Sequence, residues 1–357
     1  MKILVYDVAA EDGGGIFVLK SFYKEVLAYN NPDIEWIFMV STPEIAATEK
    51  IKVLYYPHIK QSWGKRLKFE YIMLPKIIRE MSPDLIISLQ NMPAMRCDVR
   101  QFVYLHQSLQ YCQKRFSLFK NDERGLAIRQ RFISMLIKIS MPKAEHIFVQ
   151  TQWIKDATIK WLKCDEKIVS IVPVSVNTDG IEIKEYIGFN SRAFFYPARA
   201  ELYKNHSLII EACRILNRKG IDDYQVILTM RPDENLYAKR IAENAQGLPI
   251  TYTGALPYKE IWETYSRTIL LFPSYLETCG LPMLEARKAG AVILASDTPF
   301  SHEALAGYPN AHFFSINSAE QLADAMINVL NNSDYQKWYN DKPHKESSLL
   351  NSMLEKI

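Results

Sequence analysis

Apolar positions along the first half of the chain fall into short blocks, separated by longer segments with helical spacing. The short blocks predict buried strands at residues 3–8, 34–40, 85–89, 102–105 and 146–150. Between the first two blocks, residues 16–29 repeat their apolar positions at intervals typical of a helix. Alternation of this kind predicts a parallel sheet wrapped by helices.

The same pattern starts again after residue 170. We expect strands at residues 194–197, 225–229, 250–252, 269–272 and 292–295, and a helix at residues 207–218. Proline and small polar residues interrupt the pattern at residues 172–179 and favour a linker. The predicted domains are therefore residues 1–172 and 173–335. Residues 336–357 would add a C-terminal helix packed on the body of the protein. In one arrangement, this helix crosses back to the N-terminal domain.

The composition places the chain among soluble globular proteins. Of its 357 residues, 48% are apolar and 23% are charged, and no stretch reaches the roughly 20 apolar residues of a spanning helix. The first apolar block is interrupted by Asp7 and is too short for a secretion signal. The five cysteines lack the spacing of a disulfide framework, which indicates reduced thiols and a cytoplasmic location.

Positive charge is concentrated in residues 60–143. This segment has 16 Lys and Arg residues against 6 Asp and Glu residues, although the net charge of the whole chain is only +3. Within it, residues 124–140 combine basic and apolar residues in a pattern that suits the surface of an anionic membrane. The alternative is a solvated basic face over ordinary core helices. The basic residues form no known nucleic-acid motif, so nucleic acid is not an expected partner.

The turn at residues 278–281 has the features of an anion site. Proline is favoured at the first position of a helix, and Gly290 suits its end, so this turn precedes a helix that starts at Pro282. Unpaired backbone N–H groups and the positive end of the helix dipole would favour a diphosphate there. Every parallel α/β protein, however, has several turns of this kind.

Two glutamates flank the turn. Glu285 lies one turn inside the expected helix, where an acidic residue also suits the helix dipole. Glu277 follows the strand at residues 269–272, at the edge where open α/β sheets bind their ligands. Carboxylates would repel a bare phosphate but can accept hydrogen bonds from hydroxyl groups. A nucleotide sugar has both phosphates and hydroxyl groups and fits this combination.

Two cations follow the strand at residues 194–197. Arg199 and Lys204 precede the helix expected from residue 207, where positive charge opposes the helix dipole. A bound anion would explain their position, with Arg199 gripping phosphate oxygens and Lys204 acting as a point charge. The alternative is a surface pair with Glu201.

Weaker candidates lie in the first half of the chain. Gly14 and Gly15 stand between the first strand and the first helix, where they either allow a ligand to approach the backbone or complete a tight turn. His106 directly follows the strand at residues 102–105, and its imidazole either donates to a substrate oxygen or is a structural histidine. No spacing of histidines and cysteines indicates a zinc site, so no metal is expected.

Together these residues resemble the retaining glycosyltransferases of family 4, the glycosyl transferases group 1. The family's two glutamates, separated by seven residues that contain Gly-Leu-Pro, match Glu277 and Glu285. Its diphosphate-binding Arg and Lys match Arg199 and Lys204. Weaker matches are Gly14, Gly15, His106 and the segment Gly254-Ala255-Leu256. The resemblance implies the α/β GT-B fold, in which two Rossmann-like domains with parallel sheets face a central cleft.

The resemblance also implies a role for each matched residue. Glu285 would hold the ribose and Glu277 the transferred sugar. The donor would also contact Thr278, Cys279, Gly280 and Leu281 near the diphosphate, and Gly254, Ala255 and Leu256 on the base side. Catalysis would involve His106, Arg199, Lys204 and Glu277, with same-face attack and neither a metal nor a cofactor. Thr278-Cys279 replaces the family's usual Gly-Phe, so a UDP-sugar and a GDP-sugar both remain open as the donor.

The expected function is therefore transfer of a hexose from a nucleotide-diphosphate sugar to an acceptor hydroxyl, in the assembly of envelope polysaccharide, lipopolysaccharide or glycolipid. The carbohydrate or lipid-linked acceptor would bind the N-terminal half, at the inner face of the cell membrane. Two alternatives keep the fold. A sugar-nucleotide epimerase or hydrolase would need no acceptor. A catalytically silent scaffold would need no reactive site, and the matched charged residues speak against it.

Overall fold

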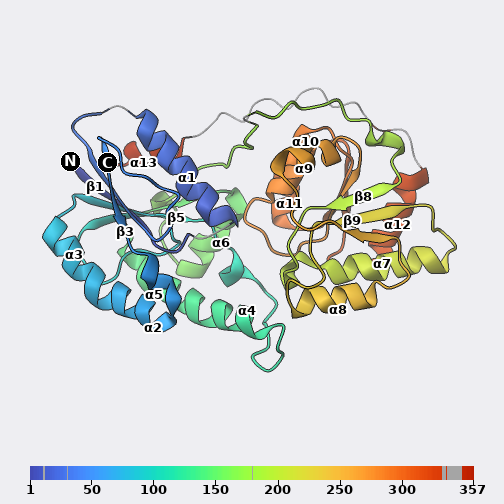
Figure 1. Ribbon diagram of the computed structural model, residues 1–357, viewed down its shortest axis with the longest axis horizontal. Helices are drawn as coiled ribbons and strands as arrows, with labels where there is room; N and C mark the ends of the chain where they lie inside the picture. The colour runs from blue at the N-terminus through green and yellow to red at the C-terminus, as the bar shows by residue number, and fades with distance from the viewer. Residues whose placement is uncertain (11–12, 30, 179, 332–334, 336–347) are drawn as a thin grey trace. The chain divides into compact units, whose positions relative to one another are not determined.

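The computed structural model describes residues 1–10, 13–29, 31–178, 180–331, 335 and 348–357. These residues form two compact units, each built on its own parallel sheet (Figure 1). The N-terminal unit comprises Met1–Tyr111, Ile128–Val174 and the described residues 348–357. The C-terminal unit comprises Cys112–Ala127 and the described residues from 175 to 335. Two parallel-sheet α/β units confirm the expected fold class.

Within the described residues, the sheet of the N-terminal unit has seven parallel strands in the order β3-β2-β1-β4-β5-β6-β7. The strands are β1 (Lys2–Asp7), β2 (Glu35–Val40), β3 (Ile51–Tyr55), β4 (Leu85–Ser88), β5 (Arg100–Leu105), β6 (His146–Val149) and β7 (Val169–Ile171). The strand order reverses between β1 and β4. In open α/β sheets, ligands bind outside the carboxyl ends of the strands at such a point.

Helices cover both faces of this sheet. Successive side chains of a strand point to opposite faces. Ile3 and Val5 therefore join the core beneath α1 (Gly13–Ala28), whereas Leu4 and Tyr6 join the core beneath α3 (Leu74–Met81). The other helical segments of the unit include α2 (Trp63–Lys68), the π-type turns η2 (Phe69–Met73) and η4 (Arg129–Ile133), α5 (Ser134–Ser140), α6 (Gln152–Leu162) and α13 (Leu349–Leu354). Burial on both faces explains why the central strands are apolar along their whole length.

In the described part of the C-terminal unit, six parallel strands follow the order β10-β9-β8-β11-β12-β13. They are β8 (Ala193–Tyr196), β9 (Gln225–Leu228), β10 (Ile250–Tyr252), β11 (Ile269–Phe272), β12 (Ile293–Ser296) and β13 (Ala311–Phe314). The helices are α7 (His206–Arg218), α8 (Leu236–Asn244), α9 (Tyr258–Tyr265), α10 (Leu281–Lys288), α11 (Pro299–Ala304) and α12 (Ala319–Asn331). The short helix α4 (Arg124–Ile128) belongs to this unit up to Ala127. Here the strand order reverses between β8 and β11.

The sequence pattern did not predict β3, β7 and β13. All three are edge strands with partly exposed side chains. They therefore lack the uninterrupted apolar block that marks β11, in which every residue is buried. Edge strands with one open side carry a weaker hydrophobic signal than central strands.

Residues 112–127 also differ from the prediction, because they fall within the predicted first domain but group with the C-terminal unit. Asp122 forms an ion pair with Arg240 of α8 at 2.6 Å, and the Lys114 ammonium lies 5.4 Å from the centre of the Tyr275 ring. These contacts join residues far apart in the sequence. A local pattern could not reveal them.

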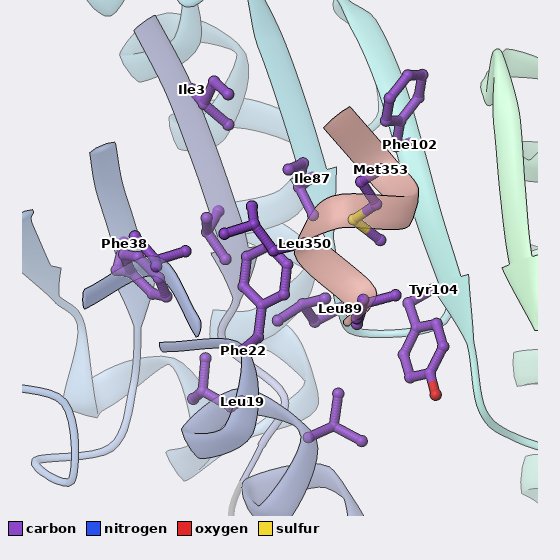
Figure 2. Packing of buried hydrophobic residues seen from close by; sticks show 14 of the residues in the cluster. Ile3, Leu19, Phe22, Phe38, Ile87, Leu89, Phe102, Tyr104, Leu350 and Met353 are labelled. Carbon is purple, nitrogen blue, oxygen red and sulfur yellow. The ribbon is translucent and has the colours of Figure 1, made fainter. Parts of the chain in front are cut away.

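The C-terminal helix α13 packs on the N-terminal unit. Figure 2 shows Leu350 and Met353 within the apolar core that also contains Phe22 of α1 and Ile87 of β4. The Ser348 hydroxyl and the Leu350 amide both donate to Glu25 Oε2, at 2.6 and 2.8 Å. Residues 336–347 of the predicted C-terminal segment lie outside the described residues.

Candidate functional site

Two loops of the C-terminal unit meet where its strand order reverses. The Tyr196 hydroxyl, at the end of β8, donates to the Lys204 carbonyl at 2.9 Å and accepts from the Ser274 hydroxyl at 2.8 Å. The Tyr275 amide donates to the Tyr203 carbonyl at 3.0 Å. These bonds hold the loop after β8 against the loop after β11.

Lys204 and Glu277 form an ion pair at this junction. Lys204 Nζ lies 2.6 Å from Glu277 Oε1, and the two side chains are only 18% and 13% exposed. The partners are 73 positions apart in the sequence. Because both charges are largely withdrawn from water, loss of either would leave the other poorly compensated. The structure thus brings together two of the predicted site residues, one cation and one carboxylate.

The turn that follows Glu277 is shaped by Gly280. This residue has a φ of +66° and caps α10 without a side-chain hydrogen bond, and Leu281 and Pro282 start the helix. The amides of Cys279 and Gly280 donate no hydrogen bond within the described part of the chain. Two backbone donors thus remain available at the start of α10. Burial raises the pKa of the Cys279 thiol to about 12, so this thiol is neutral at pH 7.

Glu285 lies deeper, on the buried side of α10. Tyr265 of α9 donates to Glu285 Oε2 at 2.9 Å. The Tyr258 hydroxyl shares its one proton between Glu285 Oε1 at 3.0 Å and the Asn177 carbonyl oxygen at 2.8 Å. Glu285 is 8% exposed, and burial raises its pKa to about 6 despite the opposing effect of these hydroxyl groups. It lies beyond the first turn of α10, so the helix-dipole explanation does not account for its position. Neither tyrosine was predicted from the sequence, because only the packing of α9 on α10 brings them to Glu285.

Arg199 is exposed in the loop after β8, and hydrogen bonds hold that loop in place. The amides of Ala200 and Arg231 donate to Glu234 Oε1 and Oε2, at 2.6 and 3.0 Å. The loop after β8 is thereby tied to the segment after β9. The Arg199 side chain accordingly projects from a fixed backbone, at the same sheet edge as Lys204.

The predicted base-side segment Gly254-Ala255-Leu256 follows β10. Gly254 has a φ of +70°, and a Cβ there would lie 3.3 Å from Arg231 Cγ. Arg231 belongs to the segment after β9, so the loops after β9 and β10 are close together. These loops lie at the same edge of the sheet as the Lys204–Glu277 pair because all strands are parallel.

The predicted glycines of the N-terminal unit lie in the first turn of α1, which starts at Gly13, and not in the loop before it. A Cβ on Gly14 would meet no atom within 4 Å, and one on Gly15 would only touch Ala10, at 3.8 Å. Packing inside the unit therefore does not require glycine at either position. A close approach of ligand to this backbone stays a prediction.

His106 is held by the loop after β4. Its amide donates to Asn91 Oδ1 at 2.7 Å, and its ring Nε2 lies 2.8 Å from the Leu89 carbonyl oxygen. A carbonyl oxygen can only accept a hydrogen bond, so Nε2 carries the ring proton and donates it to the Leu89 carbonyl oxygen. Burial lowers the pKa of the ring, which is neutral at pH 7. The expected donation to a substrate oxygen is thus not available from Nε2, which makes a structural bond instead.

Among the described residues, no group of three or more His, Cys, Asp or Glu side chains gathers closely enough to hold a metal ion. Charge at the candidate site comes from Lys204 and Glu277, and Arg199 lies in the same loop as Lys204.

Gly280→Ala tests the geometry of the turn. A Cβ at this position would lie 2.4 Å from Met283 Cε, and alanine also disfavours the positive φ. We expect about 2–4 kcal/mol of destabilisation in urea unfolding, from backbone strain and overpacking together. The matched control is Gly307→Ala, which shares a positive φ of +70° but meets no atom within 4 Å. It should cost only about 1 kcal/mol. Equal losses in the two variants would contradict the packing argument.

The family model for glycosyl transferases group 1 matches residues 182–344. The matched segment contains Arg199, Lys204, Glu277 and Glu285. The O-antigen chain mannosyltransferase RfbU of Salmonella typhimurium is 26% identical over 213 residues, which are 56% of this chain and 58% of the relative. The match thus spans little more than half of the length of that relative.

Solved structures resemble the chain over its whole length. WaaG, a glycosyltransferase involved in lipopolysaccharide biosynthesis, has a TM-score of 0.70 at 13% identity and covers 100% of this chain and 99% of its own. HepE of Anabaena, in complex with UDP and glucose, has a TM-score of 0.62 at 14% identity, with coverages of 100% and 95%. At such identities the likeness concerns the fold. The chain accordingly has the GT-B fold, and its residues 182–344 match the family model for glycosyl transferases group 1.

Proposed function

We propose that the chain transfers a hexose from a nucleotide-diphosphate sugar to a hydroxyl group of a carbohydrate or lipid-linked acceptor, with retention at the anomeric carbon. The Lys204–Glu277 ion pair carries this proposal, because it lies in the same loops as the unpaired amides of Cys279 and Gly280. A cation and backbone donors suit a diphosphate. A carboxylate beside them suits a sugar hydroxyl, so one site accommodates both parts of the donor.

In the proposed reaction, the bond between the anomeric carbon and the diphosphate oxygen breaks. Its electron pair stays on the diphosphate, which gains negative charge as it leaves. Lys204, Arg199 and the amides at the start of α10 stabilise that charge, without a metal or a cofactor. The acceptor oxygen bonds to the anomeric carbon on the same face, and its proton passes to the departing phosphate oxygen. Retention follows from this geometry.

The two glutamates would have different tasks. Glu277 forms an ion pair with Lys204. A carboxylate in an ion pair is better suited to accept a hydrogen bond than to act as a nucleophile. We therefore assign it to a hydroxyl group of the transferred hexose. Glu285 is held by two tyrosines on the same unit and would accept hydrogen bonds from the ribose. His106 stays a candidate for contact with the hexose only through its remaining ring nitrogen.

The names of similar proteins support the class of substrate. RfbU is named for mannosyl transfer to the O-antigen chain, WaaG for lipopolysaccharide biosynthesis, and HepE was solved with UDP and glucose. For the present chain we propose a UDP- or GDP-sugar donor and a role in envelope polysaccharide, lipopolysaccharide or glycolipid assembly. Such work would take place in the cytoplasm, at the inner face of the cell membrane.

A surface of the N-terminal unit supports contact with a membrane. Ile128, Phe132, Met135 and Ile139 are all exposed, and their spacing places them on one side of the helix through η4 and α5. Arg129, Arg131 and Lys138 lie among them. No helix in the described ranges has the length and apolar composition to cross a bilayer. An exposed apolar row with basic neighbours suits the surface of an anionic bilayer.

Lys204→Ala tests the donor site. Nucleotide that binds only the folded protein should stabilise the wild type by about 2.7 kcal/mol at a hundredfold excess over Kd. We expect UDP or GDP and their sugar conjugates to raise the Tm of the wild type, and ADP is tested for comparison. Lys204→Ala should lose most of that shift in Tm. Lys219→Ala is the control, since Lys219 pairs with Asp324 at 3.1 Å on the surface of the same unit. If no nucleotide stabilises the wild type, the donor proposal is wrong.

The pH dependence of nucleotide binding tests Glu285. A carboxylate that accepts ribose hydroxyl groups must be ionised, and its pKa is raised to about 6. Binding should therefore be complete above pH 7 and weaken as the pH falls through about 6. Tyr265→Phe removes a bond that lowers this pKa, so the weakening should move upward by about one pH unit. The control is Tyr224→Phe, which removes a hydroxyl group that donates to the Cys213 carbonyl. Calorimetry of nucleotide binding to this variant should give the same pH dependence as the wild type.

Liposome flotation tests the membrane surface. The double variant Phe132→Ser/Ile139→Ser should reduce binding to vesicles that contain phosphatidylglycerol by about tenfold or more, since each buried apolar side chain contributes about 1.5–3 kcal/mol. The control is Phe119→Ser, because Phe119 is exposed but lies outside this row. Equal flotation of the wild type on vesicles of phosphatidylcholine alone would rule out the anionic surface as the partner.

A further inference from the structure

A second polar cluster lies in the N-terminal unit, at the reversal of strand order between β1 and β4. Arg66 Nε donates to Glu70 Oε1 at 3.0 Å, and Arg66 Nη2 donates to Gln90 Oε1 at 3.1 Å. Gln90 Nε2 donates to the same Glu70 oxygen at 3.3 Å. Tyr6, near the carboxyl end of β1, completes the cluster. Its members come from α2, η2, β1 and the loop after β4.

The cluster is largely buried, and one of its buried atoms, the Tyr6 hydroxyl, is unsatisfied. Glu70, Gln90 and Tyr6 are 8%, 6% and 0% exposed. The Tyr6 hydroxyl makes no hydrogen bond of ordinary geometry, although it is close enough to Glu70 for that carboxylate, together with burial, to raise the pKa of the phenol. Within the part of the chain that the structure describes, Glu70 Oε2 and Arg66 Nη1 make no hydrogen bond to protein, but unlike the Tyr6 hydroxyl they are not enclosed, so a ligand can reach them from solvent.

Fold stability does not explain such an arrangement. A buried ion pair contributes little compared with well-packed apolar side chains, and each unsatisfied buried polar group costs about 1–3 kcal/mol. Glu70 also lies in a π-type turn, which widens the helix between α2 and α3 and frequently marks a functional site. The position at a switch point adds a further reason to expect a ligand.

The unused atoms define the chemistry of that ligand. Arg66 Nη1 requires an acceptor, and Glu70 Oε2 requires a donor. Arg66 is the most accessible member, with 23% of its side chain exposed. A phosphate would satisfy Arg66 but would be repelled by Glu70. Neighbouring hydroxyl groups of a sugar ring both donate and accept, so they satisfy both atoms.

The loop after β4 connects this cluster with His106. Gln90 bonds to Glu70, and the next residue, Asn91, accepts from the His106 amide at 2.7 Å. Asn91 has a φ of +68°, a left-handed conformation that directs consecutive side chains to different partners. One loop thus connects Gln90 and His106 at the carboxyl edge of the same sheet.

We propose that Arg66, Glu70 and Gln90 form a specificity site for a hydroxylated sugar ring of the acceptor. This inference rests on the proposed glycosyl transfer. It adds the residues that select the acceptor, and it makes the acceptor's terminal unit a hexopyranose with adjacent free hydroxyl groups. Glu70 accepts from one hydroxyl group, and Arg66 donates to its neighbour.

Saturation-transfer NMR with methyl α-D-mannopyranoside and methyl α-D-galactopyranoside tests the site. At least one of these should bind the wild type, and Glu70→Gln should weaken it by about tenfold, the value for one lost charge-assisted hydrogen bond. Arg66→Lys is a change at a more exposed position that keeps the positive charge. It should also weaken binding, because lysine lacks the planar guanidinium group with its several N–H donors. The matched control is Glu145→Gln, whose partner Arg100 lies 2.7 Å away at the amino edge of the same sheet.

The outcomes separate this proposal from the donor site. We expect both variants to keep the wild-type shift in Tm with UDP or GDP, while Lys204→Ala keeps glycoside binding. Failure of both glycosides to bind the wild type would overturn the acceptor site, as would unchanged binding in Glu70→Gln and Arg66→Lys. Loss of glycoside binding in Glu145→Gln to the same degree would also overturn it. Absence of any nucleotide shift in the wild type would count against the donor site alone.

Discussion

The reversal of strand order in each sheet is the constraint on which both polar sites depend. A parallel sheet brings the carboxyl ends of all its strands to one edge, and open sheets bind ligands at that edge where the strand order reverses. In the C-terminal unit, this rule places the loop of Lys204 against the loop of Glu277. In the N-terminal unit, it places Gln90 near the end of β1. The chemistry differs, but the geometry has one origin.

Environment gives the two glutamates of the C-terminal unit different properties. Glu277 stands in a loop and forms an ion pair with a lysine. Glu285 is enclosed between α9 and α10, where burial opposes ionisation and two tyrosine hydroxyl groups favour it. Eight positions along the chain therefore separate an ion-paired carboxylate from a buried carboxylate whose pKa is raised to about 6. A single ligand with two kinds of hydroxyl group can use both.

The N-terminal unit combines an apolar core with polar groups at one edge. On one face of its sheet, α1 and α13 bury Phe22, Leu350 and Met353 in an apolar cluster. On the other face, β1 contributes Leu4 to the apolar core and Tyr6 to the boundary with Glu70. Stability of the unit therefore resides in its centre. The edge is free to hold partly unsatisfied polar atoms.

The sequence by itself determined the two α/β units, most central strands and the identity of the charged residues around Pro282. Those features follow from local patterns, because a strand buried on both faces is apolar throughout and a helix start has characteristic residues. Only the tertiary structure decided that Lys204 pairs with Glu277, that Tyr258 and Tyr265 hold Glu285, and that residues 112–127 join the C-terminal unit. It also assigned the His106 ring proton to Leu89. Each of these depends on contacts between distant residues, and the spacing of residues along one segment carries no information about which other segment packs against it.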